Sequence, residues 1–194
     1  MNGSIRRLGR WVVVTKERHF DFISKALPNA ELTEKLPEGH GLQLVTFGSG
    51  IIIPKENLQY WDGTINFHGA SPDYPGRDPH HWAAYEDARS FGATAHAIWP
   101  KVDSGPICGQ LILGVTPPVS PKLYAEIGET ALYALFQAWC SQTTGFSFEA
   151  GITWSGITRK RQDLIDLCDM RGVTKNEKER RKRAFQGFEK YFLE

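Results

Sequence analysis

Apolar residues along the chain occur in short runs separated by longer amphipathic stretches. Five runs rich in β-branched and aromatic residues have the length of buried strands: residues 10–15, 42–47, 64–68, 93–99 and 107–115. Between them, apolar residues recur every three or four positions, which predicts helices over 16–27, 54–61, 79–91 and 121–140. This alternation favours the α/β class, with a mostly parallel sheet that helices cover on both faces.

Local signals refine these helices and the loops beside them. Asp78 and Pro79 are residue types preferred at the N-cap and the first position of a helix. The inner face of that helix is predicted to contain Trp82, Tyr85 and Ala88. The longest predicted helix has apolar residues at four-residue intervals: Leu123, Ile127, Ala131, Leu135 and Trp139. Residues 28–41, with two prolines and two glycines, are predicted to form a polar loop.

Composition narrows the class of protein. The chain has 194 residues, with 23 Lys and Arg against 22 Asp and Glu, and a formal net charge of +1. This balance lacks the basic excess of a general nucleic-acid-binding protein, so no stable nucleic-acid binding is expected. Three cysteines fit neither a disulfide framework nor a four-cysteine zinc site. Without a span of roughly 20 apolar residues or the apolar core of a secretory signal, we expect a cytoplasmic protein with no membrane association.

The most informative polar pair lies on the third predicted strand. Asn66 and His68 are two residues apart, so both project from one face of the strand, while Ile65 and Phe67 project into apolar packing. At the carboxyl end of such a strand, an amide and an imidazole can donate hydrogen bonds to a developing oxyanion. The alternative is a capping asparagine and a structural histidine, and the spacing alone favours this alternative.

Two further signals depend on residues elsewhere in the chain. Asp103 could favour the charged form of His68, or it could be an ordinary turn residue in the sequence DSGP. His80, His81 and His96 raise the alternative of a metal site. Adjacent histidines on a helix are not expected to point inward together, however, so we predict no metal.

Taken together, two segments resemble one known family. NFHGASPDYPGRDPHHWA (66–83) and GATAHAIWPKVDSGPI (92–107) contain Asn-x-His, a loop with Ser, Pro, Tyr and Gly, then P-x-x-W-A, G-x-T-x-H and D-x-G-P-I. This order of motifs resembles the folate-dependent formyltransferases, which include glycinamide ribonucleotide, methionyl-tRNA and sugar-nucleotide formyltransferases. The resemblance is specific over residues 42–110 and partial after them.

The resemblance implies a Rossmann-like catalytic domain, 10-formyltetrahydrofolate as the formyl donor, an amine acceptor and no metal. It identifies Asn66, His68 and Asp103 with the catalytic residues of the family. An uncharged amine would attack the formyl carbon, and Asn66 and protonated His68 would donate hydrogen bonds to the oxyanion. Asp103 would keep His68 protonated and relay the proton that the amine loses.

The same resemblance implies binding residues. The segment FGSGIIIP resembles the family's pterin loop, which assigns donor binding to Gly50, Ile51, Ile52 and Ile53. His96 could belong to the same donor site, or it could be a packed core histidine. The turn TKERHF after the first strand lacks the glycine with which relatives bind the acceptor's phosphate, and Gly69 stands where proline is common. Acceptor binding is therefore assigned to cations: Lys16, Arg18 and Arg77. The alternative is that Lys16 and Arg18 are solvated loop charges, and the sequence alone favours it slightly.

The expected organisation is a catalytic domain over residues 1–145, with a shortened N-terminal part, and a C-terminal extension over 146–194. The family's transfer-RNA enzymes and formyl-folate deformylases carry further domains, so a small-molecule amine is the expected acceptor. An amino-sugar nucleotide comes first, with glycinamide ribonucleotide and methionyl-tRNA as alternatives. A catalytically impaired folate- or nucleotide-binding protein is the alternative of another class, and a homodimer remains open.

Overall fold

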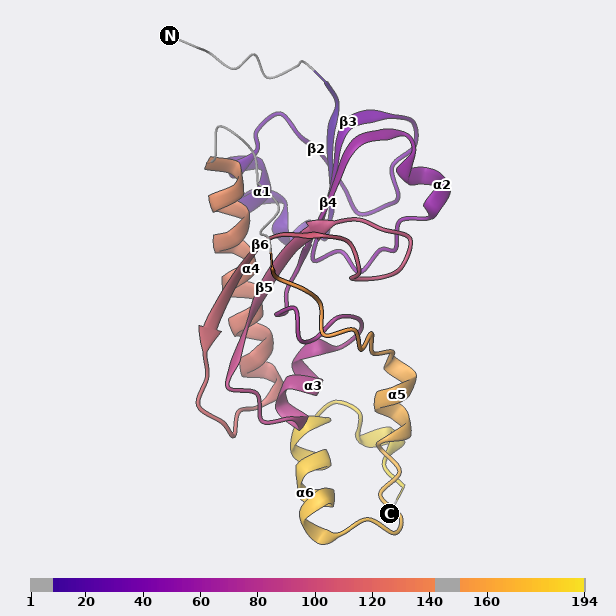
Figure 1. Ribbon diagram of the computed structural model, residues 1–194, viewed down its shortest axis with the longest axis vertical. Helices are drawn as coiled ribbons and strands as arrows, with labels where there is room; N and C mark the ends of the chain where they lie inside the picture. Colours follow the sequence, from indigo (N-terminus) through magenta and orange to yellow (C-terminus); the bar gives the residue numbers. More distant parts are fainter. Residues whose placement is uncertain (1–8, 142–150, 194) are drawn as a thin grey trace.

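The computed structural model describes residues 9–141 and 151–193, which contain a six-stranded sheet with helices around it (Figure 1). The strands are β1 (Trp11–Thr15), β2 (Glu31–Thr33), β3 (Gly41–Phe47), β4 (Trp61–His68), β5 (Ser90–Ala97) and β6 (Ile107–Gly114). Their order in the sheet is β2-β1-β3-β4-β5-β6. The first four strands of this order pair in parallel, and β5 is antiparallel to both its neighbours. The expected α/β class with a mostly parallel sheet is confirmed.

Helices lie on both faces of the sheet. The helices of the described residues are α1 (Phe20–Ala26), α2 (Lys55–Leu58), α3 (Pro79–Tyr85), α4 (Pro121–Ser141), α5 (Arg161–Asp166) and α6 (Lys175–Ala184), with 3-10 turns at Glu17–His19 and Glu189–Tyr191. Residues of α1 and α4 pack on one face, in a core that includes Val45, Phe47 and Phe67. The other face has a smaller core near α2. Figure 1 shows α4 along one side of the sheet and α2 on the opposite side.

One strand was not predicted, and another, β5, departs from the parallel arrangement of the others. Strand β2 lies inside the segment predicted to be a loop, where Glu31 pairs with Val12 at the edge of the sheet. With three residues, it is too short to show a periodic pattern. The last two strands form an antiparallel pair because residues 98–106 connect them, and a parallel crossover needs about a dozen residues or more.

The helix predicted over residues 79–91 ends early. Helix α3 stops at Tyr85, and the chain enters β5 at Ser90. Asp78 occupies the N-cap position but makes no capping hydrogen bond, and its φ is +56°. Its carboxylate instead accepts two hydrogen bonds from Arg161, at 2.8 and 2.6 Å. A charge-assisted bidentate contact with a distant segment has replaced the local cap.

The buried face of α4 is broader than the predicted stripe. Ala131 and Leu135 are buried as expected, but Leu123 is 45% exposed. The packed face also includes Gly128, where an added Cβ would lie 2.5 Å from the Gly69 carbonyl oxygen. Because this helix lies against both the sheet and the loop after β4, four-residue spacing alone does not define its buried face.

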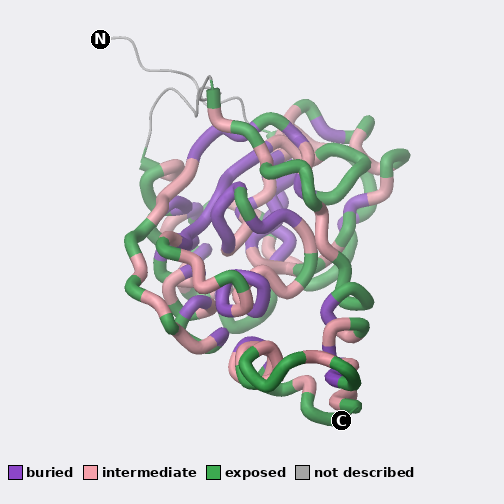
Figure 2. The backbone as a smooth tube through the Cα atoms, turned by 60° about the horizontal axis from the view of Figure 1, so that its bottom comes forward, coloured by how far each residue is buried: buried purple, intermediate pink, exposed green. Residues whose placement is uncertain are grey.

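Buried residues concentrate along the centre of the sheet (Figure 2). A second core joins α3 and α4 to the C-terminal helices, through Trp82, Tyr124, Leu164 and Phe185. The domain boundary expected at 145/146 lies outside the described residues. Among the residues that are described, no helix combines the length and apolar character needed to cross a membrane.

Candidate active site

A cavity of about 810 Å³ lies against the sheet face opposite α1 and α4. Its floor is a row of polar side chains on three neighbouring strands: Thr46 on β3, Asn66 on β4 and His96 on β5. The register pairs Thr46 with Asn66 and Asn66 with His96, so all three point to the same face. Ile65 and Phe67 point to the other face, as the alternation along this strand predicted.

The Asn66 amide is held at both ends. The Thr46 hydroxyl donates a hydrogen bond to Asn66 Oδ1 at 2.5 Å, and Asn66 Nδ2 lies 2.9 Å from His96 Nε2. Because an amide nitrogen carries two hydrogens, one N–H can serve His96 while the other faces the cavity. The amide therefore presents an oriented donor to a bound carbonyl group.

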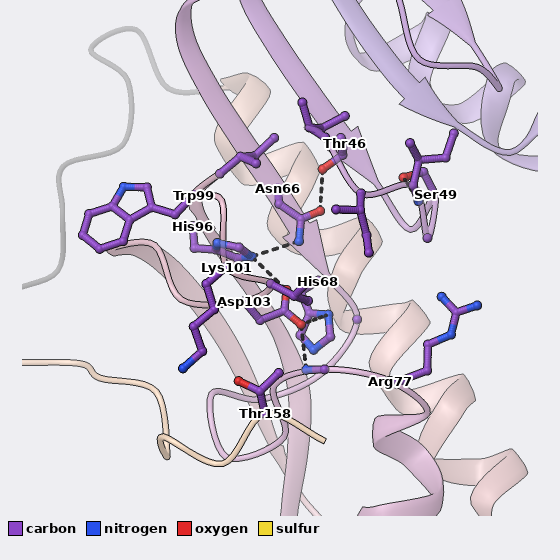
Figure 3. A pocket seen from close by; sticks show the side chains of 18 of the residues that line it. Thr46, Ser49, Asn66, His68, Arg77, His96, Trp99, Lys101, Asp103 and Thr158 are labelled. Atoms are coloured by element: carbon purple, nitrogen blue, oxygen red, sulfur yellow. Dashed lines mark hydrogen bonds and ion pairs between the residues drawn. The ribbon is translucent and has the colours of Figure 1, made fainter. Parts of the chain in front are cut away.

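His96 connects Asn66 to Asp103. The imidazole is 2% exposed, and its Nδ1–H donates to the Ala97 carbonyl at 2.8 Å. Its Nε2 lies 2.9 Å from Asn66 Nδ2 and 3.3 Å from Asp103 Oδ1. With a neutral ring, Nε2 accepts from Asn66; with a protonated ring, it donates to Asp103. The amide and the carboxylate are thus coupled through one nitrogen atom (Figure 3).

His68 lies on the other side of the same carboxylate. Its Nε2–H donates to the Tyr74 carbonyl at 3.1 Å, and its Nδ1 is 3.7 Å from Asp103 Oδ2. With Nε2 bearing a proton, a second proton on Nδ1 would face the carboxylate. The imidazole and the carboxylate are therefore close enough for a direct electrostatic interaction.

Asp103 is the centre of this cluster and is only 8% exposed. Burial raises the pKa of its carboxyl, but the charge of His68, the hydrogen bond to His96 and the Gly76 N–H outweigh burial and bring the pKa to about 2. The Gly76 N–H donates to Oδ2 at 2.8 Å. Asp103 itself has a backbone φ of +44°, a conformation that is uncommon outside glycine. The backbone at Asp103 is therefore strained, and its side chain is a charged carboxylate that is buried.

The predicted donor-binding loop forms one wall of the cavity. Gly50, Ile51, Ile52 and Ile53 all line it. Ile53 is 3% exposed and packs in the smaller core, whereas Ile52 is 67% exposed. The Ile51 N–H donates to Ser49 Oγ at 3.2 Å, which closes the turn. The wall is apolar, and the floor is polar.

The three cations assigned to the acceptor separate into two places. Arg77 lines the cavity, and its Nη1 would lie 3.5 Å from a Cβ added to Gly50. Lys16 and Arg18 are not among the described residues that line the cavity. Arg18 instead pairs with Glu129 on α4 at 3.0 Å. This ion pair depends on the packing of two distant helical segments, so it has no local sequence signal.

Sequence reasoning missed several contributors to the site. The carbonyl of Tyr74 and the N–H of Gly76 act through the backbone, which residue type does not reveal. The cavity is also lined by C-terminal residues of the segment 156–161, among them Thr158 and Arg159. A polar residue near the end of an apolar strand could have marked Thr46. No local signal marks the C-terminal segment.

The adjacent histidines of α3 differ in burial: His81 is buried, whereas His80 is only partly buried. Their rings lie 4.4 Å apart, and His81 Nδ1–H donates to the Ala184 carbonyl at 2.7 Å. The pKa of His80 is lowered to about 4, mainly by burial and to a smaller extent by the charge of the neighbouring His81. C-terminal residues pack against His81, whose ring also lies 5.1 Å from that of Phe188, because this side of α3 is a packing surface. Within residues 9–141 and 151–193, no group of three or more His, Cys, Asp or Glu could hold a metal ion.

Comparison with known sequences gives a family match over all six strands of the sheet and most of α4. The profile described as "Formyl transferase" matches residues 11–135. A curated relative, the formyltetrahydrofolate deformylase of Corynebacterium sp. (strain P-1), is 28% identical over 108 residues. That alignment covers 54% of this chain and 38% of the relative, so this chain matches less than half the length of that protein.

Comparison with solved structures gives the same fold. A 4-N formyltransferase from Francisella tularensis superposes with a TM-score of 0.73 at 15% identity, covering 91% of this chain and 87% of that chain. The formyltransferase PseJ from Anoxybacillus kamchatkensis, in complex with UDP-4,6-dideoxy-4-formamido-L-AltNAc and tetrahydrofolate, gives 0.61 at 21% identity, over 81% and 88%. An N-formyltransferase from Helicobacter canadensis, in complex with folinic acid and dTDP-3-aminofucose, gives 0.65 at 17%, over 91% and 80%.

Proposed function

The chain belongs to the formyl transferase family, and from this premise we propose that it transfers a formyl group from 10-formyltetrahydrofolate to the amine of an amino-sugar nucleotide. The observation that carries the proposal is the convergence of Asn66, His68 and Asp103 on one cavity. Neighbouring structures that contain folates and nucleotide-linked sugars support the two substrate classes.

The cavity suits a folate-type donor in size and lining. Its volume of about 810 Å³ is within the range of roughly 300–1,000 Å³ typical of small-molecule sites. The apolar wall of Ile51, Ile52 and Ile53 would cover a flat ring, whose polar edge would meet backbone groups of the same loop. The formyl group would then lie over the polar floor beside Asn66.

The reaction needs donors for one oxyanion and a route for one proton. The acceptor nitrogen attacks the formyl carbon, and the carbonyl oxygen becomes an oxyanion. Collapse breaks the bond to N10 of the donor, which takes up a proton as the amine loses one. Asn66 Nδ2 supplies one hydrogen bond to the oxyanion, and charged His68 supplies a second. Asp103 stabilises the charge of His68 and accepts or returns the proton.

One contact would have to change when a substrate binds. His68 Nε2–H donates to the Tyr74 carbonyl, so an oxyanion would compete with that carbonyl for the same proton. A developing negative charge is the stronger acceptor, because charge-assisted hydrogen bonds are about twice as strong as neutral ones. The loop that contains Tyr74 would therefore shift slightly during turnover, as its carbonyl gives up the hydrogen bond from His68.

The acceptor's phosphate groups would lie on the side of Lys16 and Arg18. These residues follow β1 at the carboxyl edge of the sheet, where ligands bind in such folds. Arg18 Nε donates a hydrogen bond to His19 Nε2 at 3.2 Å. His19 Nε2 in turn lies near Gly48, which lines the cavity, since a Cβ added to Gly48 would be 3.7 Å from it. Arg77, across the cavity, would bind a second anionic group.

A variant of Arg18 tests whether this side chain binds the acceptor or only changes the net charge of the protein. Arg18→Ala is expected to raise the acceptor KM and leave the donor KM unchanged, as expected when uniform binding is lost. Lys25→Ala is the matched control, because Lys25 is an exposed cation of α1 paired with Asp21. An unchanged acceptor KM in the Lys16→Ala, Arg18→Ala double variant would remove this turn from the site.

Hydrolysis is the second candidate, and the similarity to a formyltetrahydrofolate deformylase favours it. Water would then take the place of the amine at the same floor of Thr46, Asn66 and His96. The two reactions differ only in the nucleophile, so they can be separated by product.

The deciding experiment incubates the protein with 10-formyltetrahydrofolate and follows tetrahydrofolate release with and without amines. Nucleotide-linked amino sugars are tested first and glycinamide ribonucleotide second. Amine-dependent release with a formylated product supports transfer, and amine-independent release with formate supports hydrolysis. Binding of folinic acid without either reaction would support a binding protein. Turnover is expected to survive EDTA, and loss with EDTA that zinc restores would refute the metal-free mechanism.

A further inference from the structure

The C-terminal segment of residues 151–160 crosses the loop that follows β4. The Ser155 N–H donates to the Pro72 carbonyl at 3.1 Å, and the Arg159 N–H donates to the Pro75 carbonyl at 3.1 Å. The Arg77 N–H donates back to the Arg159 carbonyl at 2.8 Å. These backbone contacts fix the segment against the loop that supplies the Tyr74 carbonyl and the Gly76 N–H to the site.

Trp154 is the residue of this segment that reaches the catalytic cluster. Its indole N–H donates to the Gly105 carbonyl at 2.8 Å. Its ring is perpendicular to His96, with centroids 4.9 Å apart, and lies 6.1 Å from the ring of His68 at 64°. One side chain therefore contacts the ring of His96, lies beside the ring of His68, and binds the loop that contains Asp103.

The loop around Asp103 needs such a contact. Asp103 has a φ of +44°, and a Cβ at Gly105 would lie 1.9 Å from the Ala97 carbonyl oxygen, so the chain turns tightly there. Left-handed backbone at a non-glycine residue persists only where the surroundings hold it. The Gly76 N–H holds the Asp103 carboxylate, and the Trp154 indole holds the loop two residues later.

We propose that Trp154 is a positioning residue for formyl transfer: it fixes the Asp103 loop and packs against His96, so that the carboxylate and both imidazoles keep their separations. This inference rests on the proposed function. Catalytic groups must be held within about half an ångström of their productive geometry, and the side chains packed around them do this. Trp154 would then support catalysis, although it follows the region that matches the family.

The first test is the kinetics of Trp154→Ala and Trp154→Phe. Trp154→Ala removes both the indole hydrogen bond and the ring contact, and kcat is expected to fall about 10²-fold, the usual cost of a misplaced group. The donor KM is expected to change less than about twofold, because Trp154 is not among the described residues that line the cavity. Trp154→Phe keeps a ring beside His96 and is expected to recover part of kcat.

The matched control is Ile157→Ala, in the same segment. Ile157 is 61% exposed and is not among the described residues that line the cavity, so its loss is expected to leave kcat unchanged. Each variant is assayed well below its own Tm, which separates the kinetic effect from unfolding. If Trp154→Ala does not fold, Trp154→Phe still tests the hydrogen bond to Gly105 alone. An unchanged kcat in the folded variants, or a loss expressed only in the donor KM, overturns the proposal.

The second test needs no activity. The ring C–H signals of His68 and His96 in proton NMR, assigned with His68→Gln and His96→Gln, are expected to shift in Trp154→Ala but not in Ile157→Ala. Unchanged histidine signals overturn the positioning role. Failure of the proposed function gives a different result: wild-type protein that consumes no 10-formyltetrahydrofolate, with histidine signals that still respond to Trp154.

Discussion

Replacing Asp103 by asparagine tests the electrostatics of the site, because it removes the charge and keeps the shape. The carboxylate is 8% exposed and lies 3.7 Å from His68 Nδ1 and 3.3 Å from His96 Nε2. An asparagine oxygen can still accept the Gly76 N–H, so the loop keeps one of its anchors. The difference between the two proteins is therefore dominated by the charge.

The expected cost follows from the pKa of Asp103. Although burial alone would raise it, the charge of His68 and the hydrogen bonds of His96 and Gly76 bring it from 3.8 to about 2. At about 1.4 kcal/mol per pKa unit, the ionised carboxylate stabilises the folded state by about 2 kcal/mol. Because the folded pKa is the lower one, this contribution is present above about pH 4 and is lost as the pH falls toward about 2.

Denaturant unfolding measures the stability effect, and folate turnover measures the catalytic one. Asp103→Asn is expected to lower the free energy of unfolding by about 2 kcal/mol at neutral pH, with a difference that shrinks below about pH 4. Turnover is expected to fall by about 10²-fold or more, since a general acid–base group typically contributes that much. Asp62→Asn, an exposed aspartate at the other end of β4, is the control. A stability difference independent of pH, or full turnover, would refute the reasoning.

Four further substitutions have expected outcomes. Asn66→Ala should lower kcat by about 10²–10³-fold with a nearly unchanged donor KM, measured in steady-state assays, and an equal loss in binding would argue against an oxyanion donor. Gly69→Ala should be neutral or stabilise by up to about 1 kcal/mol, because a Cβ there meets atoms only at 3.9 Å. Gly128→Ala should destabilise by about 1–3 kcal/mol, because its Cβ would lie 2.5 Å from the Gly69 carbonyl; denaturation curves that rank them the other way would contradict this packing. Burial and the charge of His81 lower the pKa of His80 to about 4, so the unfolded chain binds more protons than the folded one between about pH 4 and about pH 6.5. Stability should therefore decrease as the pH falls from about 6.5 to about 4. His80→Asn should flatten this pH dependence in thermal unfolding, and an unchanged slope would show that His80 is not responsible.

The sequence by itself determined which residues share a face. A strand has a period of two, so Asn66 and His68 had to lie opposite to Ile65 and Phe67 once β4 formed. The apolar runs likewise determined the α/β class, because strands and amphipathic helices must bury their apolar faces against one another. These features depend on neighbouring residues, and the structure confirms them.

Only the tertiary structure decided which side chains meet. Asn66 is oriented by Thr46 and His96, which lie 20 and 30 residues away and reach it through the register of β3 and β5. Trp154 reaches the Asp103 loop from 49 residues beyond its partner Gly105. Such contacts depend on how distant segments pack, and several arrangements satisfy the same local pattern of apolar and polar residues. Residue types and spacing could therefore suggest candidate catalytic groups, whereas the hydrogen bonds that orient them required the folded chain.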